Sequence, residues 1–165
     1  KIDRARDDAH VLVGGLGFGY TLRAALNILP NQAKITVSES LASVVAWNQQ
    51  LVGHLAMHPL ADDRVEVVVT KIQRLIAQRP KAFDAILLDV DNGPFAVSSD
   101  TNLSLYGLKG LRAMHAALLP GGRLAIWSAG PQGGFIQKLR DAGFKPSVHK
   151  PGDGKHIIFV GDMVS

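Results

Sequence analysis

The stretch VLVGGLGFGYTLRAAL, residues 11–26, decides the fold of this 165-residue chain. It opens with apolar, β-branched residues, passes through the glycine-rich run Gly14-Gly15-Leu16-Gly17-Phe18-Gly19 and continues in a helical pattern. Glycines at such a turn permit a positive φ and let a ligand approach the backbone closely. The helix that follows presents unpaired N–H groups and the positive end of its dipole. The stretch therefore predicts a strand, a ligand-binding loop and a helix.

On both sides of this loop and further along the chain, short β-branched segments alternate with helical patterns. We expect strands at 9–14, 33–38, 64–69, 82–89 and 123–128, and helices at 21–29, 41–55, 71–78, 104–119 and 135–141. Two closing strands, 145–149 and 156–160, flank a turn-rich spacer and indicate an antiparallel hairpin. Five β-α units predict an α/β fold, a three-layer sandwich around a mostly parallel seven-stranded sheet. Ligands bind such sheets beyond the carboxyl ends of the strands.

Length and composition fit a single domain over residues 1–165, with residues 1–8 as an N-terminal tail. The chain is 47% hydrophobic and 19% charged, which argues against disorder, and it has no cysteine, which excludes disulfides and thiolate metal sites. It has no apolar run of the ~20 residues that span a bilayer and no signal-like N-terminus, so we expect a cytoplasmic protein without a membrane partner.

The charge balance, +4 with a pI of 9.6, could favour an anionic partner. The basic residues are scattered, however, and no basic patch with interleaved aromatic residues is legible. We therefore do not expect a nucleic-acid partner.

Glu39 follows the second expected strand, twenty residues after Gly19. A carboxylate in this position can accept hydrogen bonds from both hydroxyls of a ribose, so the glycine loop and Glu39 together predict an adenosine-nucleoside site. The dinucleotide-binding fingerprint is G-x-G-x-x-G, with two residues between its second and third glycines. In Gly15-x-Gly17-x-Gly19 a single residue separates them, which favours an S-adenosylmethionine-type ligand. The alternative is that the glycines only make tight turns and that Glu39 begins a helix in solvent.

Asp89 ends the fourth expected strand, and Asp91 follows two residues later, so both side chains point the same way if the strand continues. Carboxylates at the mouth of a site can bind a cationic amine and accept its proton. We predict that Asp89 is the catalytic base and that Asp91 holds the tail of the amine. Two alternatives remain: the pair could bind Mg²⁺, although no third acid is in evident reach, or Asp91 could simply belong to the turn 91–94.

With these motifs the chain resembles the class I methyltransferase fold and, within it, the spermidine synthase-like family. The resemblance runs from about residue 10 onward, through VLVGGLGFGYTLRAAL (11–26), ITVSES (35–40), RVEVVV (64–69), FDAILLDVDNGP (83–94) and LLPGGRLAIWS (118–128). It implies a transferase whose sulfonium donor, S-adenosylmethionine or its decarboxylated form, is held by Gly15, Gly17, Gly19, Glu39 and Asp89. It also implies that Asp89 lines the site of a small-molecule amine, that no metal takes part, and that the chain forms a homodimer.

The sequence departs from the family pattern at several points. Phe18 stands where family synthases carry an aspartate that faces the aminopropyl ammonium. Lys71 stands near the place of a second family aspartate, which contacts the adenine. The turn 89–94 is shorter than the family turn that two aspartates flank. The small N-terminal β domain of the synthases is also expected to be missing here. The implied reaction is aminopropyl transfer in polyamine biosynthesis. A methyltransferase with an unidentified acceptor and a non-catalytic nucleoside-binding homologue remain open as alternatives.

Overall fold

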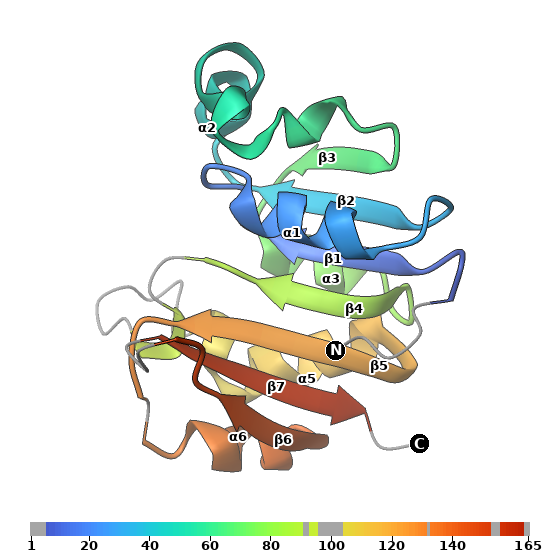
Figure 1. Cartoon of the computed structure of the whole chain (residues 1–165). Coiled ribbons are helices and arrows are strands. Elements are labelled where there is room, and N and C mark those ends of the chain that lie inside the picture. The colour runs from blue at the N-terminus through green and yellow to red at the C-terminus, as the bar shows by residue number, and fades with distance from the viewer. Residues whose placement is uncertain (1–5, 91–92, 96–103, 132, 153–155, 164–165) are drawn as a thin grey trace.

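The structure is a computed structural model that describes residues 6–90, 93–95, 104–131, 133–152 and 156–163. Within this part of the chain a seven-stranded sheet has the order β3-β2-β1-β4-β5-β7-β6 (Figure 1). The strands are β1 His10–Gly14, β2 Lys34–Glu39, β3 Val65–Val69, β4 Phe83–Leu88, β5 Leu118–Ser128, β6 Phe144–His149 and β7 Ile157–Met163.

The first five strands run parallel, and β7 runs antiparallel between β5 and β6. The predicted α/β sheet with its closing antiparallel hairpin is confirmed. Strand β1 has β2 on one side and β4 on the other, so the order of the strands reverses at β1. Loops diverge at such a point, and the crevice between them is where open α/β sheets bind ligands.

Helices cover both faces of the sheet (Figure 1). They are α1 Tyr20–Ile28, α2 Ala42–Trp47, α3 Ile72–Gln78, α5 Leu108–Ala117 and α6 Phe135–Asp141. Helix α1 buries Leu22, Ala25 and Leu26, the i, i+3, i+4 spacing of one helix face, in a core cluster on one side of the sheet. Helices α3, α5 and α6 pack into a second cluster on the other side.

Three elements differ from the sequence-based expectation. The helix expected over 104–119 is interrupted at Gly107, whose extended backbone precedes α5 at Leu108, and α5 ends at Ala117. The single helix expected over 41–55 is split into α2, a π-helical turn Asn48–Val52 and a 3-10 turn Gly53–Ala56. The Asn48 side chain donates a hydrogen bond of 3.0 Å to the Val44 carbonyl at this break, and such bonds compete with the regular helical ladder. Strand β5 begins at Leu118, before the expected Pro-Gly-Gly turn, because Leu118 pairs with Phe83 across a register shift in β4.

Arg64 joins the end of α1 to the start of β3. Its guanidinium donates hydrogen bonds of 3.2 Å to the carbonyls of Leu26, Leu29 and Pro30, in the last turn of α1 and just beyond it. Helix ends leave such carbonyls without backbone partners. Asp62 forms an ion pair of 2.8 Å with this guanidinium. The hydrogen bonds that Arg64 donates to the Asp62 carboxylate lower the pKa of that carboxyl to about 2.

None of the helices in the described part of the chain has the length and apolar character that crossing a lipid bilayer requires.

Candidate functional site

A cavity of about 330 Å³ opens at the carboxyl ends of β3, β2, β1 and β4, at the predicted edge of the sheet. Its volume lies at the lower end of the range that small-molecule sites occupy. The residues that follow each strand form its walls, and they include Gly15, Gly17, Ser38, Glu39, Lys71 and Asp89. The cavity therefore contains most of the residues that the sequence analysis singled out.

The glycine loop closes the cavity at the end of β1. Gly15 has a φ of 87°, and a Cβ on it would lie 2.5 Å from the Asp89 carbonyl oxygen, so a larger residue fits neither the backbone nor the space. A Cβ on Gly17 would meet nothing within 4 Å, which leaves the Gly17 backbone open to a ligand. Gly19 lies behind the loop, where a Cβ would come within 2.8 Å of the Pro59 ring. Gly19 thus packs the loop against the segment after α2.

Glu39, the last residue of β2, is 8% exposed and braces both sides of the cavity. Its Oε2 accepts a hydrogen bond of 3.0 Å from the Leu16 N–H in the glycine loop. Its Oε1 accepts one of 2.9 Å from the Leu41 N–H before α2. A carboxylate offers about four acceptor positions, so capacity remains for a ribose hydroxyl. The sequence does not reveal that Glu39 connects these two segments, because the hydrogen-bond donors are the backbone N–H groups of Leu16 and Leu41.

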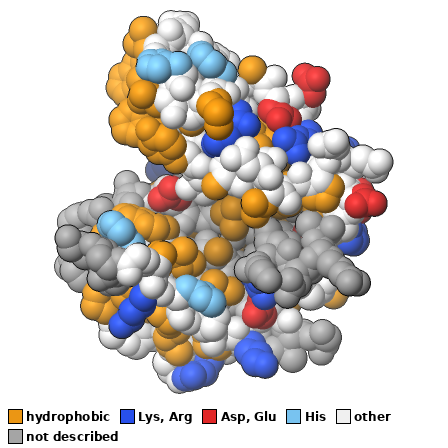
Figure 2. Space-filling model, in the orientation of Figure 1, with side chains coloured by type: hydrophobic (Ala, Val, Ile, Leu, Met, Phe, Trp, Pro, Cys, Tyr) orange, Lys and Arg blue, Asp and Glu red, His pale blue; other side chains and the backbone are white. Residues whose placement is uncertain are grey.

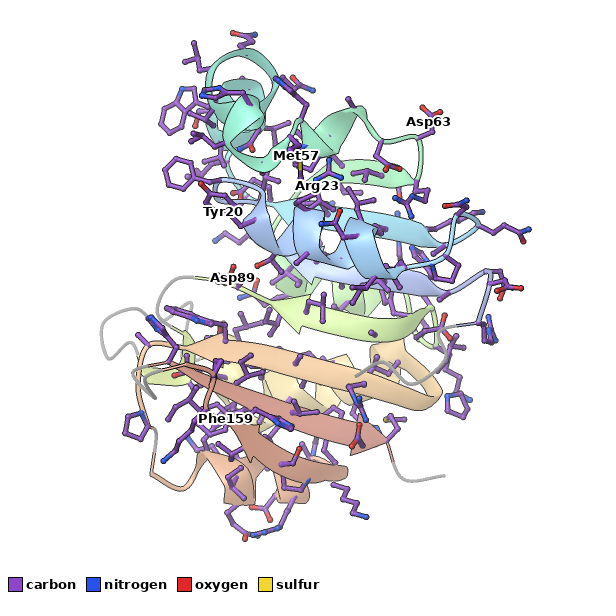
Figure 3. The ribbon with its side chains drawn as sticks, viewed as in Figure 1. Tyr20, Arg23, Met57, Asp63, Asp89 and Phe159 are labelled. Atoms are coloured by element: carbon purple, nitrogen blue, oxygen red, sulfur yellow. The ribbon has the colours of Figure 1, made fainter. Side chains whose placement is uncertain are left out.

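Asp89 lies at the end of β4, exposed at the mouth of the cavity (Figure 3). The hydroxyl of Thr21, in the first turn of α1, donates a hydrogen bond of 2.6 Å to its Oδ2. A short bond of this kind to a carboxylate is strong and fixes its orientation. The predicted partner, Asp91, lies outside the described residues, so the pairing of the two carboxylates stays a prediction.

Asn48 is a site residue that the sequence analysis missed. It is 2% exposed, and its Nδ2 donates hydrogen bonds to the carbonyls of Gly17, at 2.8 Å, and Val44. Asn48 thus ties the glycine loop to the helix that follows β2. The sequence does contain a signal that could have identified Asn48. It is a polar residue within the apolar stripe of the helix expected over 41–55, four residues after Val44 and four before Val52.

Lys71 caps α3 and lines the cavity at the end of β3. Strands β2 and β1 separate β3 from β4, so Lys71 and Asp89 enter the cavity from opposite sides. Tyr106, considered from sequence as a border residue, is buried. Its hydroxyl donates a hydrogen bond of 3.2 Å to the Val90 carbonyl, and its ring packs against Phe135.

The described residues contain no group of three or more His, Asp or Glu side chains that could hold a metal ion. Asp91 lies outside them, so the magnesium alternative for Asp89 and Asp91 is untested.

No protein-family model and no curated protein matches the sequence. Solved structures resemble the fold. Human methyltransferase-like protein 13 in complex with SAH has a TM-score of 0.77 and 20% identity, over 99% of this chain and 74% of that chain. A spermidine synthase in complex with the transition state analogue AdoDATO has a TM-score of 0.74 and 19% identity, over 96% of this chain and 54% of that chain.

The spermidine synthase from Thermotoga maritima has a TM-score of 0.72 and 18% identity, over 94% of this chain and 54% of that chain. The chain therefore spans about half the length of the two spermidine synthases, at 54% each. Likeness at such low identity shows the fold alone. Together with the strand order around β1, it establishes that the chain has the class I methyltransferase fold, the Rossmann-like fold that S-adenosylmethionine-dependent methyltransferases and spermidine synthases share.

Proposed function

We propose that this chain is a transferase that binds an S-adenosylmethionine-type sulfonium donor in the cavity and transfers the donor's aminopropyl group to a small-molecule amine. The observation that carries the proposal is the Asp89 carboxylate, oriented by Thr21 at the β1–β4 side of the cavity.

The cavity offers matching groups for the nucleoside part of such a donor. The buried Glu39 carboxylate can accept the ribose hydroxyls, and the open backbone at Gly17 lets the ligand approach the loop. Leu41 and Val44 supply apolar wall for the base. With the ribose at the end of β2, the alkyl tail of the donor extends toward β1 and β4, where Asp89 stands.

The placement of charges favours the decarboxylated donor. Both forms of the donor carry an ammonium on the tail, but S-adenosylmethionine also carries a carboxylate. Asp89 attracts the ammonium and repels the carboxylate. Among the described residues that line the cavity, the basic one is Lys71, which enters from the opposite side.

The chemistry of aminopropyl transfer needs little beyond alignment and a proton acceptor. The amine nitrogen attacks the methylene carbon bonded to the sulfonium, the carbon–sulfur bond breaks, and methylthioadenosine leaves with the bonding electron pair. An amine that is cationic in water must first lose a proton, which Asp89 can accept directly or through water. Holding the amine, the carbon and the sulfur in line supplies the rest of the acceleration.

Methyl transfer is the second candidate, and the glycine loop favours it. Phe18 and Tyr20 are exposed, with ring centroids 6.4 Å apart, and Tyr20 lies at the same end of the sheet as Asp89 (Figure 3). Phe18 offers no carboxylate at the position where family synthases carry an aspartate that faces the aminopropyl ammonium, and this loss favours methyl transfer. A non-catalytic nucleoside-binding homologue would use the same cavity without turnover.

The test combines thermal unfolding with product analysis. S-adenosylmethionine, its decarboxylated form, S-adenosylhomocysteine and methylthioadenosine are each added near 100 times their dissociation constants, where binding stabilises the fold by about 2.7 kcal/mol. We expect the decarboxylated donor and methylthioadenosine to stabilise most, and an added diamine to release methylthioadenosine. Preference for the carboxylated pair would support methyl transfer, binding without turnover would support the non-catalytic homologue, and no stabilisation would contradict all three.

Asp89→Asn provides the residue-level control. We expect it to keep the stabilisation by methylthioadenosine and to lose amine turnover. Asp63→Asn removes the same charge from an exposed residue at the opposite corner of the fold and should leave turnover unchanged (Figure 3). Equal turnover in both variants would contradict the role of Asp89 as base.

A further inference from the structure

The β3 end of the cavity carries a cation at the place where the base of a bound nucleoside would lie. In the proposed binding mode, Glu39 at the end of β2 accepts the ribose hydroxyls and the donor tail extends toward Asp89 at the end of β4. The base leaves the ribose on the other side, toward β3, which pairs with β2. Lys71 lines the cavity there, in the turn between β3 and α3.

The walls that hold the base are apolar. Leu41, which precedes α2, and Val44 within α2 line the cavity on one side, and Figure 2 shows hydrophobic side chains gathered over the α2 side of the molecule. Ile72, the first residue of α3, adds a third apolar side chain. Side chains of this kind pack against the face of a base, and all purines present a similar face. Discrimination between purines therefore depends on the polar groups of the cavity.

The polar side chains that follow β2 and β3 in the cavity wall are those of Ser40, Thr70, Lys71 and Gln73. The hydroxyls of Ser40 and Thr70 can both donate and accept, so they match either kind of purine. Gln73 already has an interaction partner in the structure. The Lys71 ammonium is donor-only, and within the described part of the chain its Nζ forms neither a hydrogen bond nor an ion pair. Lys71 is therefore the group that can discriminate.

A donor-only cation distinguishes two classes of purine. Adenine presents N7 as an acceptor beside the N6 amino group, which is a donor. A 6-oxopurine such as hypoxanthine or guanine presents N7 and O6, which are both acceptors, and lysine contacts this pair of atoms when proteins read guanine. Opposite adenine the ammonium would keep the contact with N7 but would face the hydrogens of the amino group.

We infer that Lys71 makes the cavity select a nucleoside whose base is a 6-oxopurine, so that the sulfonium donor carries hypoxanthine in place of adenine. This inference rests on the proposed function, because the position of the base follows from the ribose at Glu39 and the tail at Asp89. The transfer step itself is unchanged: the amine nitrogen attacks the methylene carbon, and methylthioinosine leaves with the electron pair of the carbon–sulfur bond. Lys71 acts on the choice of donor and takes no part in that step.

Calorimetric titration of the whole chain with methylthioadenosine and with methylthioinosine tests the inference. The two ligands share the ribose and the thioether, so the ratio of their dissociation constants reports the contribution of the base. We expect methylthioinosine to bind about tenfold more tightly, which lies within the range that a two-point contact to the edge of a base provides.

Variants at Lys71 assign the preference to its ammonium. Lys71→Met removes the charge and should bring the ratio of the two dissociation constants to about one, while Lys71→Asp should reverse it, because a carboxylate accepts from the amino group of adenine. Lys34→Met is the matched control. Lys34 is exposed at the start of β2, the end of that strand away from the cavity, so its replacement should keep the ratio of the wild type.

Three outcomes would overturn the inference. The first is a wild-type chain that binds methylthioadenosine as tightly as methylthioinosine or more tightly, which would leave the proposed function standing. The second is a preference for methylthioinosine that Lys71→Met retains, since another group would then read the base. The third is a chain that binds neither nucleoside, which would overturn the proposed function as well. The Lys71 side chain is exposed and forms no capping hydrogen bond at the start of α3, so Lys71→Met should unfold at the temperature of the wild type.

Discussion

At the scale of single residues, the site depends on hydrogen bonds of side chains that bring distant parts of the chain together. Thr21 and Asp89 are 68 residues apart in the sequence, and Gly17 and Asn48 are 31 apart. Each pair fixes the glycine loop, one to the end of β4 and the other to the helix after β2. Changes at these positions should therefore affect the shape of the cavity as well as stability.

Gly15→Ala should lower the free energy of unfolding by about 2 to 3 kcal/mol, because the positive φ and the contact with the Asp89 carbonyl both oppose a Cβ. Gly121→Ala is the control, since Gly121 has a φ of 77° but space around it, and it should lose only about 1 kcal/mol. Urea denaturation of both variants gives the difference. Equal losses would show that the contact with Asp89 carries no cost.

Asn48→Asp should open the glycine loop, because a carboxylate would face the carbonyls of Gly17 and Val44 in a buried position. We expect a loss of about 3 kcal/mol in stability and at least tenfold weaker binding of methylthioadenosine. Gln49→Glu, on the exposed side of the same turn, should change neither. Hydrogen exchange at residues 15–19 separates the two effects: unchanged protection of the loop would contradict the role of Asn48.

At the scale of elements, the parallel sheet could be predicted from the alternation of apolar strands and amphipathic helices, and the hairpin from its turn. The single helix expected over 41–55 was wrong in form, because periodicity does not reveal that a side chain such as Asn48 binds the helix backbone. The early start of β5 at Leu118 depends on its pairing with Phe83, which is a tertiary contact. For the same reason the sequence could place Glu39 and Asp89 at the sheet edge but could not identify Thr21 or Asn48.

The Asp62–Arg64 pair should make the junction between α1 and β3 sensitive to acid. The pKa of Asp62 is lowered in the folded chain to about 2, so the stabilisation is fully present above its unfolded value of 3.8 and is lost as the pH falls through 2. A difference of this size corresponds to about 2 kcal/mol. Asp62→Asn should remove that amount at neutral pH and flatten the stability profile between pH 4 and pH 2. A profile identical to that of the wild type would contradict the role of the pair.

At the scale of the whole molecule, the cavity joins the two core clusters. Ile72 and Leu105 line it from the cluster of α3 and α5, while Val44 lines it from the cluster of α1 and α2. A bound ligand therefore contacts the packing on both faces of the sheet.

Calorimetry should show one unfolding transition that methylthioadenosine shifts as a whole, with circular dichroism and tryptophan fluorescence reporting the same midpoint. Trp47 lies in α2, after β2, and Trp127 lies on β5, so their fluorescence samples the structure on both sides of β1 in the sheet. Two transitions, of which the ligand shifts only one, would show that the clusters unfold independently.

Leu41 lines the cavity and is at the same time 57% exposed on the segment that follows β2. A molecule that binds to the exposed side of Leu41 therefore contacts the wall of the donor cavity. Thermodynamic linkage makes the effect reciprocal, so a ligand in the cavity would change the affinity for that molecule by the same factor.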